Sequence, residues 1–337
     1  MSAKRKEKKV PFEVPFLLKE AVKSGRAILF LGAGASKECV NEKGQRPPDG
    51  NQLRDILSNK FFGKDMPTRT VMGVAELAIA SGSGSNLVFE AVNNAFKDFP
   101  TSEAHRKVSE FLWNRIATTN YDTFLEQAYQ DTKRRRQALI PFVKDDEPVD
   151  ERMRTSLHPV HYLKLHGCLN HRLDKDIPLV LSWESYATFS ANRKRVFQRL
   201  EDPCHESPVI FIGYSLSDLH IRDLIYRLEG KSRPRWYIVD PNAEEEDIKY
   251  WDSKNVEVFK LKFGEFMDAL EEAIPKLFRF INPPEGTIKL PLRDHYAVAG
   301  TEESNVVRAS LEKDLVHVHA TMPVAEQKAD RFYSGYD

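Results

Sequence analysis

Cysteine is scarce in this sequence, and its spacing excludes two classes of small, cross-linked fold. The three cysteines among the 337 residues are Cys39, Cys168 and Cys204. They are too few and too scattered for a disulfide framework or a four-cysteine zinc site. Scarce cysteine suits a reducing compartment, so we expect a cytoplasmic protein.

Long apolar runs and net charge are lacking as well. The longest apolar run covers only residues 27–31, far short of a membrane span, and the basic stretch at 4–9 precedes no apolar signal core. Lys+Arg and Asp+Glu each number 50, so the net charge is zero. No overall basic field attracts nucleic acid or an anionic membrane, and we expect this segment to bind neither.

Short apolar segments alternate with helical ones through most of the chain. This alternation predicts an α/β fold, a Rossmann-like, mostly parallel sheet with helices on both faces. A helical insertion of about residues 45–112 follows the first strand, and the highly charged residues 131–156 are predicted to form an exposed loop. The predicted strands are 27–31, 115–120, 162–165, 178–181, 208–212, 235–239 and 256–261.

The two ends of the chain differ in character from its middle. Residues 1–15 are predicted to be a disordered basic tail. Beyond residue 283 the chain is polar and stops in an aromatic-rich segment at 332–337. Aromatic side chains normally need a core, so we expect 283–337 to be a linker or the start of a further, truncated domain.

Glycines and polar residues follow the predicted strands. Residues 32–36 read Gly-Ala-Gly-Ala-Ser, which lets the backbone turn tightly and approach a pyrophosphate. The alternative is a tight turn with no ligand. Polar residues also follow the strands at 119–122, 213–218 and 240–242, where ligands of an open α/β sheet bind. Helix capping and turn chemistry are the alternatives there.

Histidine ends the strand at 162–165, because His166-Gly167 comes directly after it. A histidine holds or releases a proton near neutral pH, although a structural histidine is the alternative. His158 and His161 are close in sequence, but His161 and His166 have opposite parity in a strand. No carboxylate or thiolate set completes a site there, and we expect no metal.

The order of these five strand ends resembles the sirtuin family, particularly the bacterial sirtuin-like domains of phage-defence proteins. Residues 32–36 match the family's Gly-Ala-Gly-x-Ser turn, and 119–122 resemble its Thr-Gln-Asn-x-Asp motif, shortened by one residue. His166-Gly167 matches the pair that carries the catalytic histidine. Residues 213–215 are similar to the Gly-Thr-Ser cofactor loop, and 240–242 lie where the family contacts adenosine. The resemblance covers about residues 16–281.

The resemblance implies that residues 16–282 form an NAD-binding domain that hydrolyses the nicotinamide–ribose bond of NAD⁺. It implies the catalytic residues Asn120, His166 and Asp122. The NAD⁺-binding residues that it implies are Gly32, Ala33, Gly34, Ser36, Thr119, Gly213, Ser215, Asp240 and Asn242.

The resemblance further implies an effector of abortive infection, controlled by homo-oligomerisation or by a sensor domain or partner protein that recognises phage. The chain has no Cys-x-x-Cys and no Phe-Gly-Glu segment, which argues against protein deacetylation. NAD-dependent deacylation or ADP-ribosyl transfer, and a non-catalytic sensor of NAD or ADP-ribose, stay open as alternatives.

Overall fold

The computed structural model describes residues 12–156, 158–177, 179–188, 192–214, 216, 218–228 and 233–279. The predicted tail at 1–11, the predicted cofactor residue Ser215 and the segment 283–337 lie outside the described residues. By internal contacts the chain divides into two units. Pro15–Asp268 is the larger unit, and Met1–Val14 with Ala269–Asp337 make up the other. The sheet and the cleft described below belong to the larger unit.

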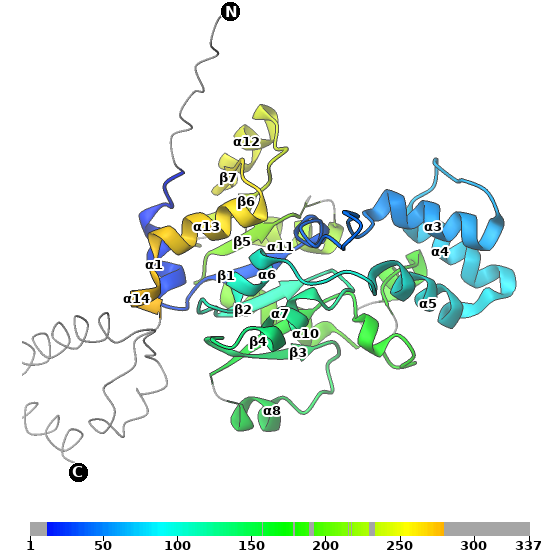
Figure 1. Ribbon diagram of the computed structural model, residues 1–337, viewed down its shortest axis with the longest axis horizontal. Coiled ribbons are helices and arrows are strands. Elements are labelled where there is room, and N and C mark those ends of the chain that lie inside the picture. The colour runs from blue at the N-terminus through cyan, green and yellow to red at the C-terminus, as the bar shows by residue number, and fades with distance from the viewer. Residues whose placement is uncertain are drawn as a thin grey trace, which may run out of the picture. The chain divides into compact units, whose positions relative to one another are not determined.

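Seven parallel strands form one sheet in the larger unit, in the order β3-β4-β2-β1-β5-β6-β7 (Figure 1). The strands β1, β5 and β6 are short apolar runs, and they are buried throughout because helices cover both faces. The parallel α/β fold predicted from the alternation is therefore confirmed. The strands are β1 Ile28–Leu31, β2 Arg115–Thr118, β3 Ala138–Phe142, β4 Pro159–Lys164, β5 Val209–Ile212, β6 Trp236–Val239 and β7 Val256–Phe259.

The helices begin and end at residues suited to those positions. Asp49 forms a capping box with Gln52 at the start of α3, and Gly63 ends that helix in the left-handed conformation. The helical elements are α1 Phe16–Lys23, α2 Ala33–Ser36, α3 Gly50–Phe62, α4 Val71–Ala78, the π-helix Ile79–Ser83, α5 Gly84–Phe96, α6 Glu103–Val108, α7 Phe124–Asp131, α8 Val149–Thr155, the 3₁₀ turn Leu169–His171, α9 Trp183–Thr188, α10 Lys194–Cys204, α11 Leu219–Arg227, α12 Glu245–Asp252, α13 Phe263–Ala273 and α14 Lys276–Arg279.

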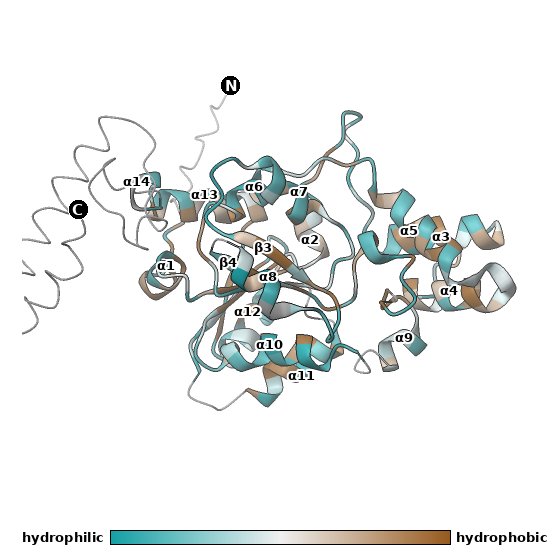
Figure 2. Ribbon diagram, turned by 90° about the horizontal axis from the view of Figure 1, so that it is seen from below, coloured by the Kyte–Doolittle hydropathy of each residue, from teal (hydrophilic) through white to brown (hydrophobic). Residues whose placement is uncertain are grey.

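Two apolar cores hold the larger unit together. The main core packs the sheet against α10 and α11, while α6 and α7 lie on the opposite side of the sheet (Figure 2). The second core joins α3, α4 and α5, which lie together beyond the carboxyl ends of the central strands (Figure 1). This second core also contains Leu169, Leu179 and Leu181, which follow β4 in the sequence.

Register brings the carboxyl ends of the central strands to one level. Leu31 pairs with Thr118 on one side and with Ile212 on the other, and Thr118 pairs with Lys164. From β1 the chain continues to β2 on one side of the sheet, and β5, on the other side of β1, continues to β6 in the opposite direction. The strand order therefore reverses between β1 and β5. A crevice at such a reversal is where open parallel sheets bind ligands.

Two sequence predictions about secondary structure are wrong. The charged stretch 131–156 is not simply an exposed loop, because it contains β3 and α8. The sheet tolerates Pro141 in β3 because this strand lies at an edge, where one side of the strand needs no donor. Residues 179–181 form no strand; their leucines are buried against α3–α5 instead.

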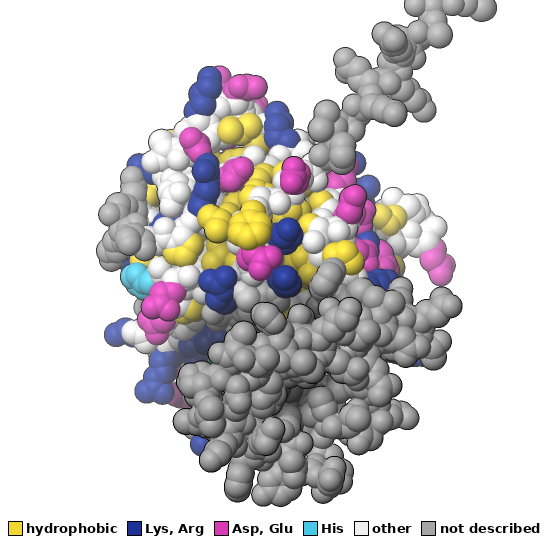
Figure 3. All heavy atoms as spheres, turned by 90° about the vertical axis from the view of Figure 1, so that its left-hand side faces the viewer, with side chains coloured by type: hydrophobic (Ala, Val, Ile, Leu, Met, Phe, Trp, Pro, Cys, Tyr) yellow, Lys and Arg dark blue, Asp and Glu magenta, His cyan; other side chains and the backbone are white. Residues whose placement is uncertain are grey.

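Surface features of the described residues agree with the balanced composition. Basic and acidic side chains are interspersed around apolar surface on the face drawn in Figure 3. Within the described part of the chain, the helices are too short or too polar for any of them to cross a bilayer.

Candidate active site

A cleft of about 1000 Å³ opens where the strands β1, β2, β5 and β6 reach their carboxyl ends. Apolar residues of α4, α5 and α9 form part of its wall, including Met72, Phe96 and Trp183. Ten of the residues predicted from sequence line it: Ala33, Gly34, Ser36, Thr119, Asn120, Asp122, His166, Gly213, Asp240 and Asn242. Gly32 is not among the lining residues, although its carbonyl oxygen anchors one of them.

Three glycines let two turns touch at the base of this cleft. The Gly34 amide donates to Gly213 O at 2.7 Å, and the Gly32 amide donates to Ile212 O at 2.9 Å. A Cβ on Gly34 would lie 2.7 Å from Gly213 Cα, closer than real Cβ atoms approach. Gly213 itself has a φ of +62°. Backbone packing therefore requires these glycines, and the Gly34 amide is already occupied rather than free for a pyrophosphate.

Asn120 is anchored at both its backbone and its side chain. Thr118 Oγ1 accepts a hydrogen bond from the Asn120 amide at 2.9 Å and donates to Leu31 O at 2.8 Å. Asn120 Nδ2 donates to Gly32 O at 2.9 Å and to Ser36 Oγ at 3.1 Å. A carbonyl oxygen can only accept, so Gly32 O fixes which end of the carboxamide faces it. Both Nδ2 hydrogens are thereby used, and Oδ1 is the atom that can accept from a ligand.

Ser36 links Asn120 to the buried carboxylate of Asp122. Ser36 Oγ donates to Asp122 Oδ2 at 2.7 Å, and Phe124 N donates to Asp122 Oδ1 at 3.3 Å. Burial raises the pKa of Asp122, an effect partly offset by nearby Lys164 and by the Ser36 hydrogen bond. The geometry makes Asp122 a support for Asn120 that acts through Ser36.

Lys164 contacts the same group from β4, through the backbone of Asp122. It is the last residue of β4, its side chain is fully buried, and its Nζ donates to Asp122 O and to Glu126 Oε1, the latter at 2.8 Å. Burial by itself lowers the pKa of Lys164, but Glu126 and neighbouring groups outweigh burial and raise the pKa. A charged lysine thus ties the loop after β2 to β4.

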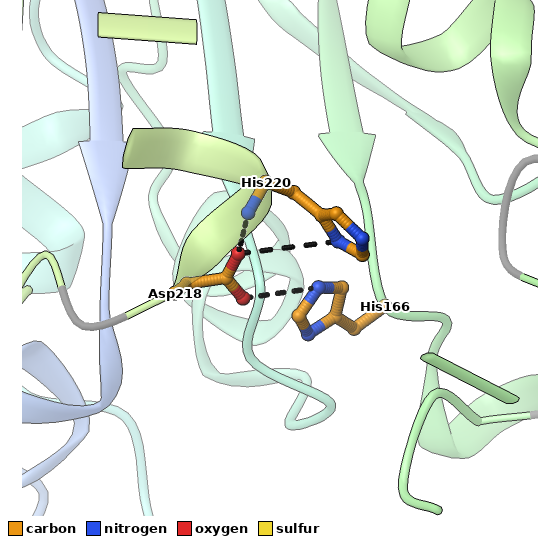
Figure 4. A group of neighbouring side chains, drawn as sticks. All are labelled: His166, Asp218 and His220. Carbon is orange, nitrogen blue, oxygen red and sulfur yellow. Dashed lines mark hydrogen bonds and ion pairs between the residues drawn. The ribbon is translucent and has the colours of Figure 1, made fainter. Parts of the chain in front are cut away.

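His166 reaches the cleft from the turn that follows β4. Gly167 makes this turn with a φ of +93°, and Val180 N donates to His166 O at 3.0 Å. His166 Nε2 lies 3.3 Å from Asp218 Oδ2, as Figure 4 shows, within ion-pair range but without hydrogen-bond alignment. Burial lowers the pKa of His166 to about 4, although Asp218 opposes this shift. The ring is therefore neutral at pH 7.

Asp218 is held in turn by the start of α11 and by Tyr186. Its Oδ1 accepts from His220 N at 2.9 Å as the helix N-cap, and from Tyr186 OH at 3.1 Å. The Tyr186 and His220 rings stack with their centroids 4.0 Å apart. One carboxylate oxygen thus fixes the orientation of Asp218, and the other faces His166 (Figure 4).

Asp240 and Asn242 lie at the far end of the cleft, after β6. The Asn242 amide donates to Asp240 Oδ1 at 2.9 Å, a turn that holds the carboxylate at the strand end. Asp240 is half-buried and Asn242 is exposed.

One cluster among the described residues could hold a metal ion. It shares only His166 with the three histidines that are close in sequence, which are His158, His161 and His166. His166, Asp218 and His220 offer ligand atoms that all lie within 4.8 Å of one another. His161 lies on β4 instead, with its ring 5.0 Å from the ring of Phe142.

Residues 114–259 match the family model described as the SIR2-like domain. The matched segment runs from the residue before β2 to the end of β7, so it contains Asn120, His166, Asp218 and Asp240. The glycine turn at 32–36 precedes it. The resemblance to the sirtuin family drawn from the sequence is confirmed.

Similarity to individual proteins is distant. Defense-associated sirtuin 2 of Bacillus subtilis is 23% identical over 251 residues, which are 71% of this chain and 23% of that protein. The chain thus spans less than a quarter of that relative's length. Among solved structures, one titled "Structural basis for the mechanism and regulation of Sir2 enzymes" is 16% identical and covers 78% of this chain and 99% of its own, with a TM-score of 0.45. A Sir2 homologue–NAD complex is 12% identical, covers 79% of this chain and 97% of its own, and has a TM-score of 0.42.

Sequence reasoning missed the group around His166. From the sequence, residues 213–218 indicate only cofactor contacts or helix capping, and nothing in the sequence marks Tyr186 or His220 as a site residue. The available signal was a carboxylate just beyond the end of β5, the strand next to β1. That signal does not identify the partner of the carboxylate, because His166 lies 52 positions away in the sequence.

Proposed function

We propose that this chain hydrolyses the nicotinamide–ribose bond of NAD⁺, giving nicotinamide and ADP-ribose. The observation that supports this most is the meeting of Asn120 and His166 in one cleft. Both groups come from a SIR2-like domain, at the crevice where a parallel sheet reverses its strand order. The roles assigned below to individual residues are part of this proposal.

The cleft suits an extended dinucleotide in size and charge. Its volume of about 1000 Å³ is at the upper end of small-molecule sites. Lys37, Arg46 and Lys262 line it and supply positive charge for a pyrophosphate. Asp240 can accept hydrogen bonds from the hydroxyls of a ribose. The adenosine half would lie near Asp240 and the nicotinamide ribose near Asn120 and His166.

Bond cleavage needs stabilisation of a cation and a positioned water more than it needs an acid. As the C1′–N bond breaks, its electron pair moves to the nicotinamide nitrogen, which becomes neutral and leaves unprotonated. Asn120 Oδ1 would accept a hydrogen bond from the attacking water or from a ribose hydroxyl. The water oxygen bonds to C1′ while its proton passes to the His166 imidazole.

Asp218 would assist His166 in this step without touching the substrate. Its carboxylate oxygen lies 3.3 Å from Nε2, where it stabilises the imidazolium that forms on proton transfer. Ser36 and Asp122 hold the Asn120 carboxamide in one orientation. The site therefore combines two working groups with three positioning residues.

NAD⁺ loss is lethal when unrestrained, so we propose that the domain acts as an effector of bacterial defence against phage. The similarity to the protein named defense-associated sirtuin 2 supports this context. Control would come from oligomerisation or from a sensing domain or partner protein. Cells that express the full protein should lose NAD⁺ on phage infection, and a His166→Ala strain should keep its NAD⁺ and permit plaques.

The direct test is turnover of NAD⁺ by purified protein at low and high concentration, followed by chromatography of nicotinamide and ADP-ribose. We expect many turnovers per chain, lowered about 10²–10⁴-fold in Asn120→Ala and His166→Ala. Thermal unfolding of each variant checks that the fold is kept. Full activity in both folded variants contradicts the residue assignment.

Two other outcomes distinguish the alternative functions. Nicotinamide release that depends on an added acyl-lysine peptide or protein acceptor indicates deacylation or ADP-ribosyl transfer. Tight NAD⁺ binding with no product, by the full-length protein together with its trigger, indicates a sensor module.

A further inference from the structure

We propose that His166, Asp218 and His220 form a Zn²⁺ site, and that the bound ion switches off the reaction by occupying His166. The inhibitory half of this proposal rests on the proposed function, whereas the binding half does not. The site uses His220, a residue with no part in the chemistry proposed above.

The distances fit a site that is nearly formed. Ligands of a tetrahedral zinc ion, bound at about 2.0–2.1 Å, lie roughly 3.3 Å from one another. His166 Nε2 and Asp218 Oδ2 are already 3.3 Å apart. One ligand atom from each of the three residues lies within 4.8 Å of the other two. A small rotation of the His220 ring would bring the third ligand into place.

The chemistry of the three ligands also favours a transition metal. Two imidazoles and one carboxylate make a donor set typical of open zinc sites, in which water fills the fourth position. His166 and Asp218 line the cleft, which gives an ion a path of entry.

Surrounding contacts already hold two of the ligands in place. The Tyr186 hydroxyl donates to Asp218 Oδ1, and the Tyr186 ring stacks on the His220 ring. One residue therefore orients two ligands. Such outer contacts strengthen metal sites by fixing the ligands before the ion arrives.

Inhibition follows from the identity of one ligand. With Nε2 bound to the metal, the neutral His166 ring would carry its proton on Nδ1, so neither nitrogen could accept the proton of the attacking water. Asp218 would at the same time be drawn from His166 to the ion. The ion would therefore act as an inhibitor of hydrolysis rather than as a cofactor.

The test separates binding from activity. Zn²⁺ affinity is measured on the purified, chelator-treated full chain by competition with a chromogenic zinc indicator. His220→Phe keeps the aromatic stack on Tyr186 but lacks the nitrogen ligand, and His220→Leu is a second variant in case the first folds poorly. His171→Ala, at an exposed histidine, is the matched control.

We expect the chain and the His171→Ala control to bind one Zn²⁺ per chain, and the His220 variants to bind at least about 10-fold more weakly, since even outer-shell partners contribute that much. Zinc should inhibit NAD⁺ hydrolysis by the chain and by the control, whereas each His220 variant should lose little of its own metal-free rate when zinc is added. Equal zinc affinity in the chain and its His220 variants overturns the site.

Binding without inhibition in an active enzyme overturns the switch. A chain that binds zinc through His220 but never turns over NAD⁺ refutes the proposed function, and with it the switch, while leaving the site intact.

Discussion

Replacing Ser36 by alanine is expected to weaken both the fold and the reaction, because one hydroxyl serves two partners. Ser36 Oγ donates to the buried Asp122 carboxylate at 2.7 Å and accepts from Asn120 Nδ2 at 3.1 Å. A hydrogen bond to a charged group contributes about 1.5–3 kcal/mol and a neutral one about 0.5–1.5 kcal/mol. We therefore expect the free energy of unfolding to fall by about 2–4 kcal/mol.

The effect on turnover has a different origin from the effect on stability. Without Ser36, the Asn120 carboxamide keeps only its bond to Gly32 O, and Oδ1 loses its fixed direction. Misplacement of a positioning group by about 1 Å can cost about 10²-fold, so we expect kcat for NAD⁺ to fall about 10–100-fold with little change in KM. Urea denaturation measures the first effect, and steady-state nicotinamide release measures the second.

Ser58→Ala is the matched control. Ser58 is also fully buried, but its hydroxyl donates only to Asp55 O in the same helix and lies outside the cleft. We expect it to lose about 1 kcal/mol of stability and no activity. The reasoning fails if Ser36→Ala turns over NAD⁺ at the wild-type rate, because Asn120 would then need no support from Ser36 and Asp122.

Three further predictions concern stability. Gly213→Ala should cost at least about 2 kcal/mol in urea denaturation, because it adds a backbone clash to the strain of positive φ, whereas Gly63→Ala, with a similar φ and open space, should cost about 1 kcal/mol. Equal costs would contradict the close approach of the two turns. Burial lowers the pKa of His105 to about 3, so the unfolded chain binds its proton more tightly. The stability that depends on neutral His105 is complete above pH 6.5. It is lost as the pH falls toward 3, by at most about 1.4 kcal/mol per pH unit. His105→Phe should flatten this part of the stability–pH curve, and an unchanged slope would refute the assignment. Lys164→Met should cost about 3–5 kcal/mol because it leaves Glu126 without its buried partner, and adding Glu126→Gln should restore part of that loss in a double-mutant cycle; strict additivity would show that the pair is not coupled.

Much of the fold followed from local patterns in the sequence. The strands β1, β5 and β6 are apolar runs that are buried throughout, and such runs stand out against charged helical segments. The edge strand β3 did not stand out, because it lies within charged sequence and contains Pro141. Leu179 and Leu181 were predicted to lie in a strand, but they pack against helices instead, and the local sequence does not show which element a buried residue contacts.

The sequence by itself determined the class of fold and the positions at which polar residues follow strands. Local patterning decides both, since each depends on neighbours along the chain. Only the tertiary structure decided that the glycines at 32, 34 and 213 serve backbone packing, and that Asp122 reaches Asn120 through Ser36. It alone brought Asp218 and His220 to His166. These contacts join residues 52 to 181 positions apart in sequence, and the strand order and register, rather than the identity of either partner, bring them within bonding distance.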